Sequence, residues 1–142
     1  MYIKNNANGD IGKSVHLQDG YSLATQEEID AYILTQDKKI KLRELKDYRY
    51  NFCVSGFSYN GNTFDLEDVL SIFEAKESNR NKFFNLNSAE VDFTDTAGFD
   101  SFKSALLIEK DRIMVKYHNY KKKIDDCATS AAINAITIDF SV

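Results

Sequence analysis

Few residues in this chain have the types and the spacing that catalysis or metal binding requires. The sequence has 142 residues and two histidines, His16 and His118. A helical histidine that holds a metal ion works with a second ligand about four residues away, and a general base needs an orienting partner. Around His118 those positions hold Met114 and Lys122. We therefore expect His118 at the protein surface or at its boundary, without a catalytic role.

Three aspartates that lie near one another suggest a cation site: Asp92, Asp95 and Asp100. The calcium-loop pattern D-x-[DN]-x-[DN]-G is absent around them. Aspartate also favours turns and helix N-termini, because its carboxylate accepts hydrogen bonds from backbone N–H groups. The simpler prediction is that these are turn and capping residues and that the protein binds no metal.

The two cysteines, Cys53 and Cys127, lie far apart and in different predicted helices. Without a C-x-x-C pair, neither a zinc site nor a thioredoxin-type redox site is supported. The two thiols could pair with each other, but cytoplasmic thiols usually act as small buried apolar residues, and we predict that role for both.

Nucleotide-binding and acyl-transfer motifs are missing as well. The six glycines form neither G-x-G-x-x-G nor G-x-x-x-x-G-K-[ST], and no G-x-S-x-G occurs. The sequence therefore predicts no catalytic residue, no cofactor and no enzymatic activity.

The charge pattern argues against nucleic acid and membranes as partners. The chain has 18 Lys and Arg residues and 22 Asp and Glu residues, a formal net charge of −4. Acidic side chains flank the basic runs at 38–41 and 121–123, so solvated helix faces are the favoured interpretation. No apolar run approaches the about 20 residues of a membrane span, and the N-terminus lacks the apolar core of a secretion signal. These features predict a protein kept in the cytoplasm or assembled there into something larger.

A β-hairpin is predicted at residues 56–64. Asn60 and Gly61 tolerate the positive φ that both central positions of a type I′ turn require, and large aromatic rings flank them. Asp65 follows directly and is placed to cap a helix that we expect to end near Phe84.

A longer helix is predicted before the hairpin. Thr25 and Glu28 form a capping box, and apolar residues follow at mostly helical spacing. These residues are Ile29, Ile33, Ile40, Leu45, Tyr48 and Phe52. Because Gln36 and Asp37 interrupt the pattern, residues 25–52 form either one helix, long enough for bundle packing, or two.

The strongest periodic signal lies in the last third of the chain. A helix beginning near Asp100 carries apolar residues at steps of four, seven, four, three, four and three. They are Phe102, Leu106, Ile113, Tyr117, Tyr120, Ile124 and Cys127. A short strand at 89–94 precedes this helix, a short helix starting at Thr129 follows it, and residues 138–142 form a tail.

These elements predict an α+β fold: a small helical domain with a long heptad helix, one β-hairpin and short strands. We expect residues 1–24 to form an N-terminal arm with one or two short strands, and residues 25–142 to form a single α+β domain.

Aromatic residues provide the one feature that invites a functional interpretation. The chain has eight tyrosines and ten phenylalanines, more than one small core requires. Most are expected in the core, and the alternative is that some form an exposed interface for a partner. The candidates for that interface are Phe57, Tyr59, Phe64, Tyr48 and Tyr50.

From residue 40 onward, the order of motifs resembles a family of phage-encoded, tail-associated proteins with a domain of unknown function. Residues 44–49 match the helical pattern E-L-x-x-x-R, and residues 56–65 match G-F-x-Y-x-G-x-x-F-D in full. A strand with a polar turn and a long helix with a central histidine, here His118, follow in the same order. One departure is Phe93, where members usually have tryptophan.

This resemblance implies a structural or assembly role in a phage tail. The protein would be a tail, baseplate or fibre-attachment component of the virion, or a tail-fibre assembly chaperone that works in the host cytoplasm. Its partners would be other phage tail or fibre proteins, with which it would be oligomeric in the assembly. A rival hypothesis is a phage regulator that binds a host protein. The family implies no catalytic residue.

Overall fold

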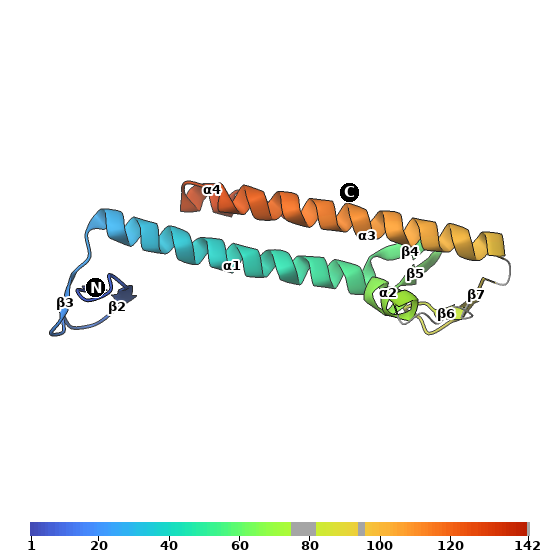
Figure 1. The fold of residues 1–142 in the computed structure, drawn as a ribbon, viewed down its shortest axis with the longest axis horizontal. Coiled ribbons are helices and arrows are strands. Elements are labelled where there is room, and N and C mark those ends of the chain that lie inside the picture. Colours follow the sequence, from blue (N-terminus) through green and yellow to red (C-terminus); the bar gives the residue numbers. More distant parts are fainter. Residues whose placement is uncertain (75–81, 94–95, 142) are drawn as a thin grey trace. The chain divides into compact units, whose positions relative to one another are not determined.

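The computed structural model describes residues 1–74, 82–93 and 96–141 of the chain. The protein is an α+β protein, as predicted, with long helices and short antiparallel strands (Figure 1). It divides into two compact units, each built from segments that are distant in sequence. The first unit combines Met1–Leu42 with Ile124–Ile136, and the second combines Arg43–Lys123 with Thr137–Val142.

In the first unit, the N-terminal residues form a three-stranded antiparallel sheet with the order β2-β1-β3. Its strands are β1 (Tyr2–Asn5), β2 (Ile11–Lys13) and β3 (Tyr21–Leu23). The sequence predicted only one or two strands here. A strand as short as β3 escapes detection, because three residues are too few to show an alternating pattern.

One uninterrupted helix, α1 (Gln26–Ser55), follows the sheet, which confirms the first of the two alternatives. Both halves of the capping box are present. Thr25 Oγ1 accepts a hydrogen bond from Glu28 N at 3.2 Å, and Glu28 Oε2 accepts one from Thr25 N at 2.9 Å. Lys4 Nζ forms an ion pair with Glu28 Oε1 at 2.5 Å, so β1 is joined to the start of the helix.

The predicted apolar face of α1 is buried only in part. Leu45 and Cys53 are its buried residues, whereas Ile40 and Tyr48 are 60% and 50% exposed. The prediction is wrong for Ile40 because it lies five residues before Leu45, which turns it by about 140° around the helix. Tyr48 lies at the edge of the buried stripe, where the ring reaches solvent.

The first unit also contains the short helix α4 (Ser130–Asn134). Thr129 caps it as predicted, since its Oγ1 accepts a hydrogen bond from Ala132 N at 3.2 Å. Within this unit, a hydrogen bond connects α1 to the C-terminal segment: Lys38 Nζ donates to the carbonyl oxygen of Asp125 at 2.6 Å.

The second unit begins with the predicted hairpin, β4 (Phe57–Tyr59) and β5 (Asn62–Phe64). The φ angles of Asn60 and Gly61 are 48° and 76°, so both central residues have the positive φ of a type I′ turn, as expected.

The helix after the hairpin, α2 (Leu66–Glu74), starts where it was predicted to start. Asp65 Oδ1 accepts a hydrogen bond from Asp68 N at 3.1 Å. The predicted end near Phe84 is wrong, because Lys82–Phe84 form a strand, β6. Residues 75–81 of that predicted helix lie outside the described part of the chain.

Strand β6 pairs with β7 (Glu90–Asp92), which lies within the strand predicted at 89–94. The turn between them contains Asn85, whose side-chain nitrogen donates to Asn62 Oδ1 at 2.9 Å. The backbone N–H of Leu86 donates to the carbonyl oxygen of Thr63 at 2.8 Å. These bonds tie the second strand pair to the first.

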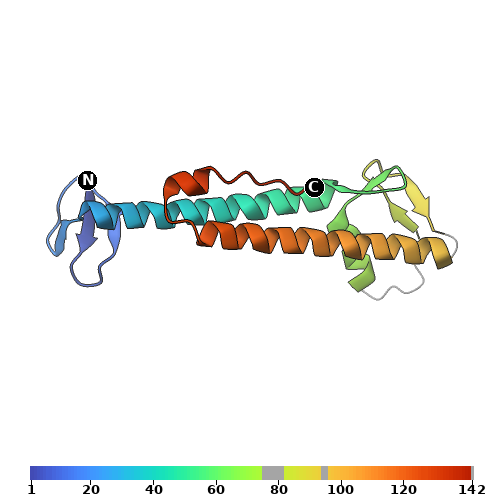
Figure 2. The same cartoon turned by 90° about the horizontal axis from the view of Figure 1, so that it is seen from above.

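The last long helix, α3 (Thr96–Asp125), begins a turn earlier than predicted. Its predicted stripe is confirmed, since five of the seven residues are buried: Phe102, Leu106, Ile113, Tyr117 and Ile124. Cys127 lies beyond the end of the helix and is only partly buried, so the prediction of a buried residue is wrong there. Within the second unit, α3 runs antiparallel to the adjoining part of α1 (Figures 1 and 2).

Aromatic rings form the core of the second unit around Phe102, which is fully buried. The ring of Phe93 stacks on it with a centroid distance of 4.3 Å and an interplanar angle of 16°. Four further rings lie within 6.0 Å of it, from Phe57, Tyr59, Phe64 and Phe83. This cluster joins both strand pairs to α3.

Residues 138–141 of the predicted C-terminal tail form an extended segment of the second unit without regular structure (Figure 2), and Val142 lies outside the described residues. Ile138 and Phe140 are buried, and the alternate residues are exposed. The hydroxyl of Tyr120 accepts a hydrogen bond from Asp139 N at 3.1 Å and donates one to the carbonyl oxygen of Asp139 at 3.3 Å. The tail therefore belongs to the folded unit.

Charged side chains are frequent along both long helices. Among the residues that the structure describes, no helix has the length together with the apolar character that crossing a membrane demands.

Candidate functional site

The residues proposed from sequence as a partner interface separate into two groups. Phe57 and Phe64 are 4% and 0% exposed, and Tyr59 is half-buried among the rings around Phe102. These three rings stabilise the core and form no exposed patch. On α1, by contrast, Tyr48 and Tyr50 are 50% and 62% exposed, and their role as a partner interface stays a prediction.

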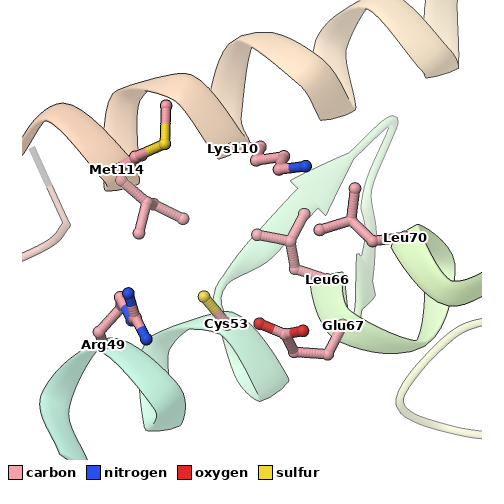
Figure 3. Close-up of a pocket in the computed structure, with 8 residues that line it drawn as sticks. Arg49, Cys53, Leu66, Glu67, Leu70, Lys110 and Met114 are labelled. Carbon is pink, nitrogen blue, oxygen red and sulfur yellow. The ribbon is translucent and has the colours of Figure 1, made fainter. Parts of the chain in front are cut away.

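A hollow with a volume of about 280 Å³ lies in the second unit, beside the α1 segment that carries Arg49 and Cys53. Side chains of α1, α2 and α3 converge around it (Figure 3). The lining residues are Arg49, Cys53, Leu66, Glu67, Leu70, Lys110, Ile113 and Met114. We call this feature the three-helix hollow.

The inner wall of the three-helix hollow is apolar. Leu66 and Ile113 are 2% and 3% exposed, and Cys53 is 5% exposed. Burial raises the pKa of the Cys53 thiol to about 11, and the carboxylate of Glu67 adds to this shift. Because the thiolate is the nucleophilic form, Cys53 stays a protonated, unreactive thiol at neutral pH and serves as part of the wall.

Charged groups surround the apolar wall. Arg49 comes from α1, Glu67 from α2 and Lys110 from α3 (Figure 3). Within residues 1–74, 82–93 and 96–141, none of the three forms an ion pair. The guanidinium of Arg49 instead lies over the ring of Tyr117, 4.2 Å from the ring centroid. The hollow thus combines apolar walls with charges that remain available to a partner.

Local sequence explains how each wall is placed. Arg49 and Cys53 are four residues apart on α1 and therefore share one face of it. The tight hairpin and the Asp65 cap direct the first turns of α2, which carry Leu66 and Leu70, also four residues apart. No pattern in the sequence linked these residues to Lys110 on α3, so sequence reasoning missed the hollow.

The histidine and aspartates that the sequence offered as candidate catalytic or metal-binding residues do not come together in the described part of the structure. His118 is exposed on α3, as predicted. Asp92 and Asp100 are exposed, and Asp92 lies 3.9 Å from Lys82 Nζ, while Asp95 lies outside the described residues. In the part of the chain that the structure describes, no three His, Cys, Asp or Glu side chains gather as metal ligands.

No protein-family model, curated protein or solved structure matches this chain. The resemblance to phage tail-associated proteins therefore stays a prediction that rests on the motif at residues 56–65.

A second, shallower depression lies on the outer face of α3, away from the core stripe. Ile108 and Val115 border it and are 69% and 56% exposed. Between them, Arg112 donates two hydrogen bonds to Glu109, at 2.9 and 2.6 Å, and these bonds hold the pKa of Arg112 above its ordinary value. Because Arg112 is paired within its own helix, this surface offers a partner mainly two apolar side chains.

Proposed function

We propose that this protein is a structural component of a phage tail, as a tail, baseplate or fibre-attachment protein, and that it acts by contacts with other tail or fibre proteins. The full match of residues 56–65 to G-F-x-Y-x-G-x-x-F-D carries this proposal. The protein would work in the virion tail and be oligomeric in that assembly.

The physical roles of the motif residues agree with a scaffold function. A Cβ atom at Gly56 would clash with the carbonyl oxygen of Phe52, so only glycine fits the exit from α1. Gly61 supplies the positive φ of the turn, and Asp65 caps α2. The motif specifies how the chain turns between two helices, and it holds no reactive group.

The surface features support action by binding. The three-helix hollow offers apolar walls and three charged residues that form no ion pair with any described residue, and Tyr48 and Tyr50 are exposed on α1. Buried anchors surrounded by polar groups are the usual basis of affinity at protein interfaces. The protonated Cys53 thiol adds no nucleophile to this site.

A tail-fibre assembly chaperone that does not remain in the virion is the second candidate, because the same motif and the same surfaces suit a transient contact. Deletion of the gene from the phage that encodes it tests the shared role. We expect particles with defective or missing tails or fibres by negative-stain electron microscopy, restored by the wild-type gene in trans. Normal, infectious particles after deletion would contradict both tail roles and favour a regulator that binds a host protein.

A further inference from the structure

We propose that the three-helix hollow binds an apolar side chain of a partner protein that lies next to a carboxylate in the partner's sequence. The inference rests on the proposed function only in that both require a protein partner. It adds the chemistry of the segment that the partner presents.

The size and walls of the hollow favour a single side chain. Pockets for small-molecule ligands and cofactors usually enclose about 300–1,000 Å³. At about 280 Å³ and open to solvent, this hollow lies at the small end of that range. An interface anchor, in contrast, is one aromatic or aliphatic side chain that fills a desolvated apolar site. Leu66, Leu70 and Ile113 provide such walls, and Met114 adds a flexible side chain that adapts to the shape of its occupant.

The charges around the hollow favour a carboxylate beside that anchor. Arg49 and Lys110 contribute two positive charges and Glu67 one negative charge, which leaves an excess of one positive charge. No described carboxylate pairs with either cation. A carboxylate from a partner could therefore pair with Arg49 or with Lys110, since neither cation has an ion-pair partner among the described residues.

The contact between Arg49 and Tyr117 strengthens this preference. Tyr117 is 8% exposed, and its ring lies beneath the guanidinium at 4.2 Å. A cation–π contact restricts the guanidinium, while its N–H groups stay able to donate to another partner. A guanidinium oriented in this way loses less conformational entropy when it binds a carboxylate.

Glu67 gives the site a direction. It comes from α2, whereas both cations come from α1 and α3. A carboxylate of the partner is repelled by Glu67 and attracted by the cations, so the acidic residue of the segment should lie away from Glu67 and next to Arg49 or Lys110. A basic residue next to the anchor would be disfavoured by the net charge of the site.

The test uses three capped tetrapeptides as probes with the full-length ¹⁵N-labelled protein. They are acetyl-Gly-Phe-Asp-Gly-amide, the Phe-Asn peptide that lacks the charge, and the Ala-Asp peptide that lacks the anchor. We expect saturable amide shifts from the Phe-Asp peptide that centre on the residues lining the hollow. The other two peptides should bind about tenfold more weakly. Added salt should lower the affinity of the Phe-Asp peptide most, because its binding includes an ion pair.

Matched variants locate the charge requirement. Arg49→Gln and Lys110→Gln should each lower the affinity for the Phe-Asp peptide several-fold. The weak affinity for the Phe-Asn peptide should stay unchanged. Arg43→Gln is the control, since Arg43 is an exposed arginine on α1 that does not line the hollow. The dispersion of the same spectra reports whether each variant is folded.

The inference is overturned if the Phe-Asp and Phe-Asn peptides bind equally, if the shifts lie away from the hollow, or if Arg43→Gln weakens binding as much as Arg49→Gln. These outcomes would leave the tail proposal standing whenever the protein is found in virions. Absence of the protein from tails, with peptide binding intact, would instead contradict the proposed function alone.

Discussion

The guanidinium of Arg49 on α1 lies over the ring of Tyr117 on α3, with 4.2 Å between its central carbon and the ring centroid. Both residues belong to the second unit, and Arg49 also lines the three-helix hollow. One contact thus joins two helices and orients a charge at the candidate binding site.

Replacing the Tyr117 ring should weaken this contact between α1 and α3. Tyr117→Leu should lower the free energy of unfolding by about 1–2 kcal/mol, because it removes the cation–π contact and part of a nearly buried side chain. Tyr117→Phe retains the ring and should change stability by less than about 0.5 kcal/mol. Urea denaturation measures both. Equal losses for the two variants would show that the ring face contributes nothing.

Phe102 should be the most sensitive core position of the second unit. Phe102→Ala should cost about 3–5 kcal/mol, because it leaves a cavity among the rings that surround it. Leu107→Ala on the same helix, at a site that is 45% exposed, should cost less than about 1 kcal/mol. Chemical denaturation followed by near-ultraviolet circular dichroism measures both variants. Equal stability of the two would contradict a core built around Phe102.

Gly61 should tolerate asparagine better than valine. Its φ is 76°, a conformation that costs β-branched residues about 1–2 kcal/mol and asparagine less. Space is not the reason, since nothing in the described structure would lie within 4 Å of an added Cβ. Thermal unfolding of Gly61→Val and Gly61→Asn compares them. Wild-type stability in the valine variant would mean that the turn lacks this geometry.

Cys53 should resist alkylation in the folded protein. Its thiol pKa is raised to about 11 and its side chain is buried, so iodoacetamide at about pH 8 finds little thiolate. Cys127 is partly exposed and should react first, as peptide mass spectrometry would reveal. Equal rates at the two cysteines under native conditions would contradict the burial of Cys53.

The raised pKa of the Cys53 thiol should make the free energy of unfolding fall with pH in the alkaline range. A folded-state pKa above the unfolded value favours the protonated thiol, so this contribution is complete below the ordinary value of 9.0 and is lost as the pH approaches about 11. Cys53→Ala should lack this part of the dependence. Parallel pH profiles of unfolding for the wild-type and variant proteins would exclude it.

Local signals allowed much of the fold to be predicted. The Asn60-Gly61 turn and the Thr25 and Asp65 caps depend on neighbouring residues alone, and each is present as expected. The stripe on α3 was predicted because its steps keep one face toward the core over several turns.

Short elements could not be predicted in the same way. In β6, Phe83 is 1% exposed and Phe84 is 57% exposed, an alternation that only three residues carry. Helical spacing from Leu66 onward made Phe84 look like the end of a continued α2. Pairing with β7, which is a tertiary contact, decides the strand.

The three-helix hollow was beyond sequence reasoning for a related reason. Its walls come from positions 49–53, 66–70 and 110–114, and each group alone has the pattern of an ordinary helix. Only the packing of the second unit brings them together. Sequence placed Phe57 and Phe64 in a candidate interface because composition cannot separate a buried ring from an exposed one.

Quantitative mass spectrometry of purified particles, beside the lysate of infected cells, tests the central claim most directly. A tail component should be present in the particles of the phage that encodes it, at a fixed ratio to the other tail proteins. Abundance in the lysate with absence from the particles would contradict a place in the virion.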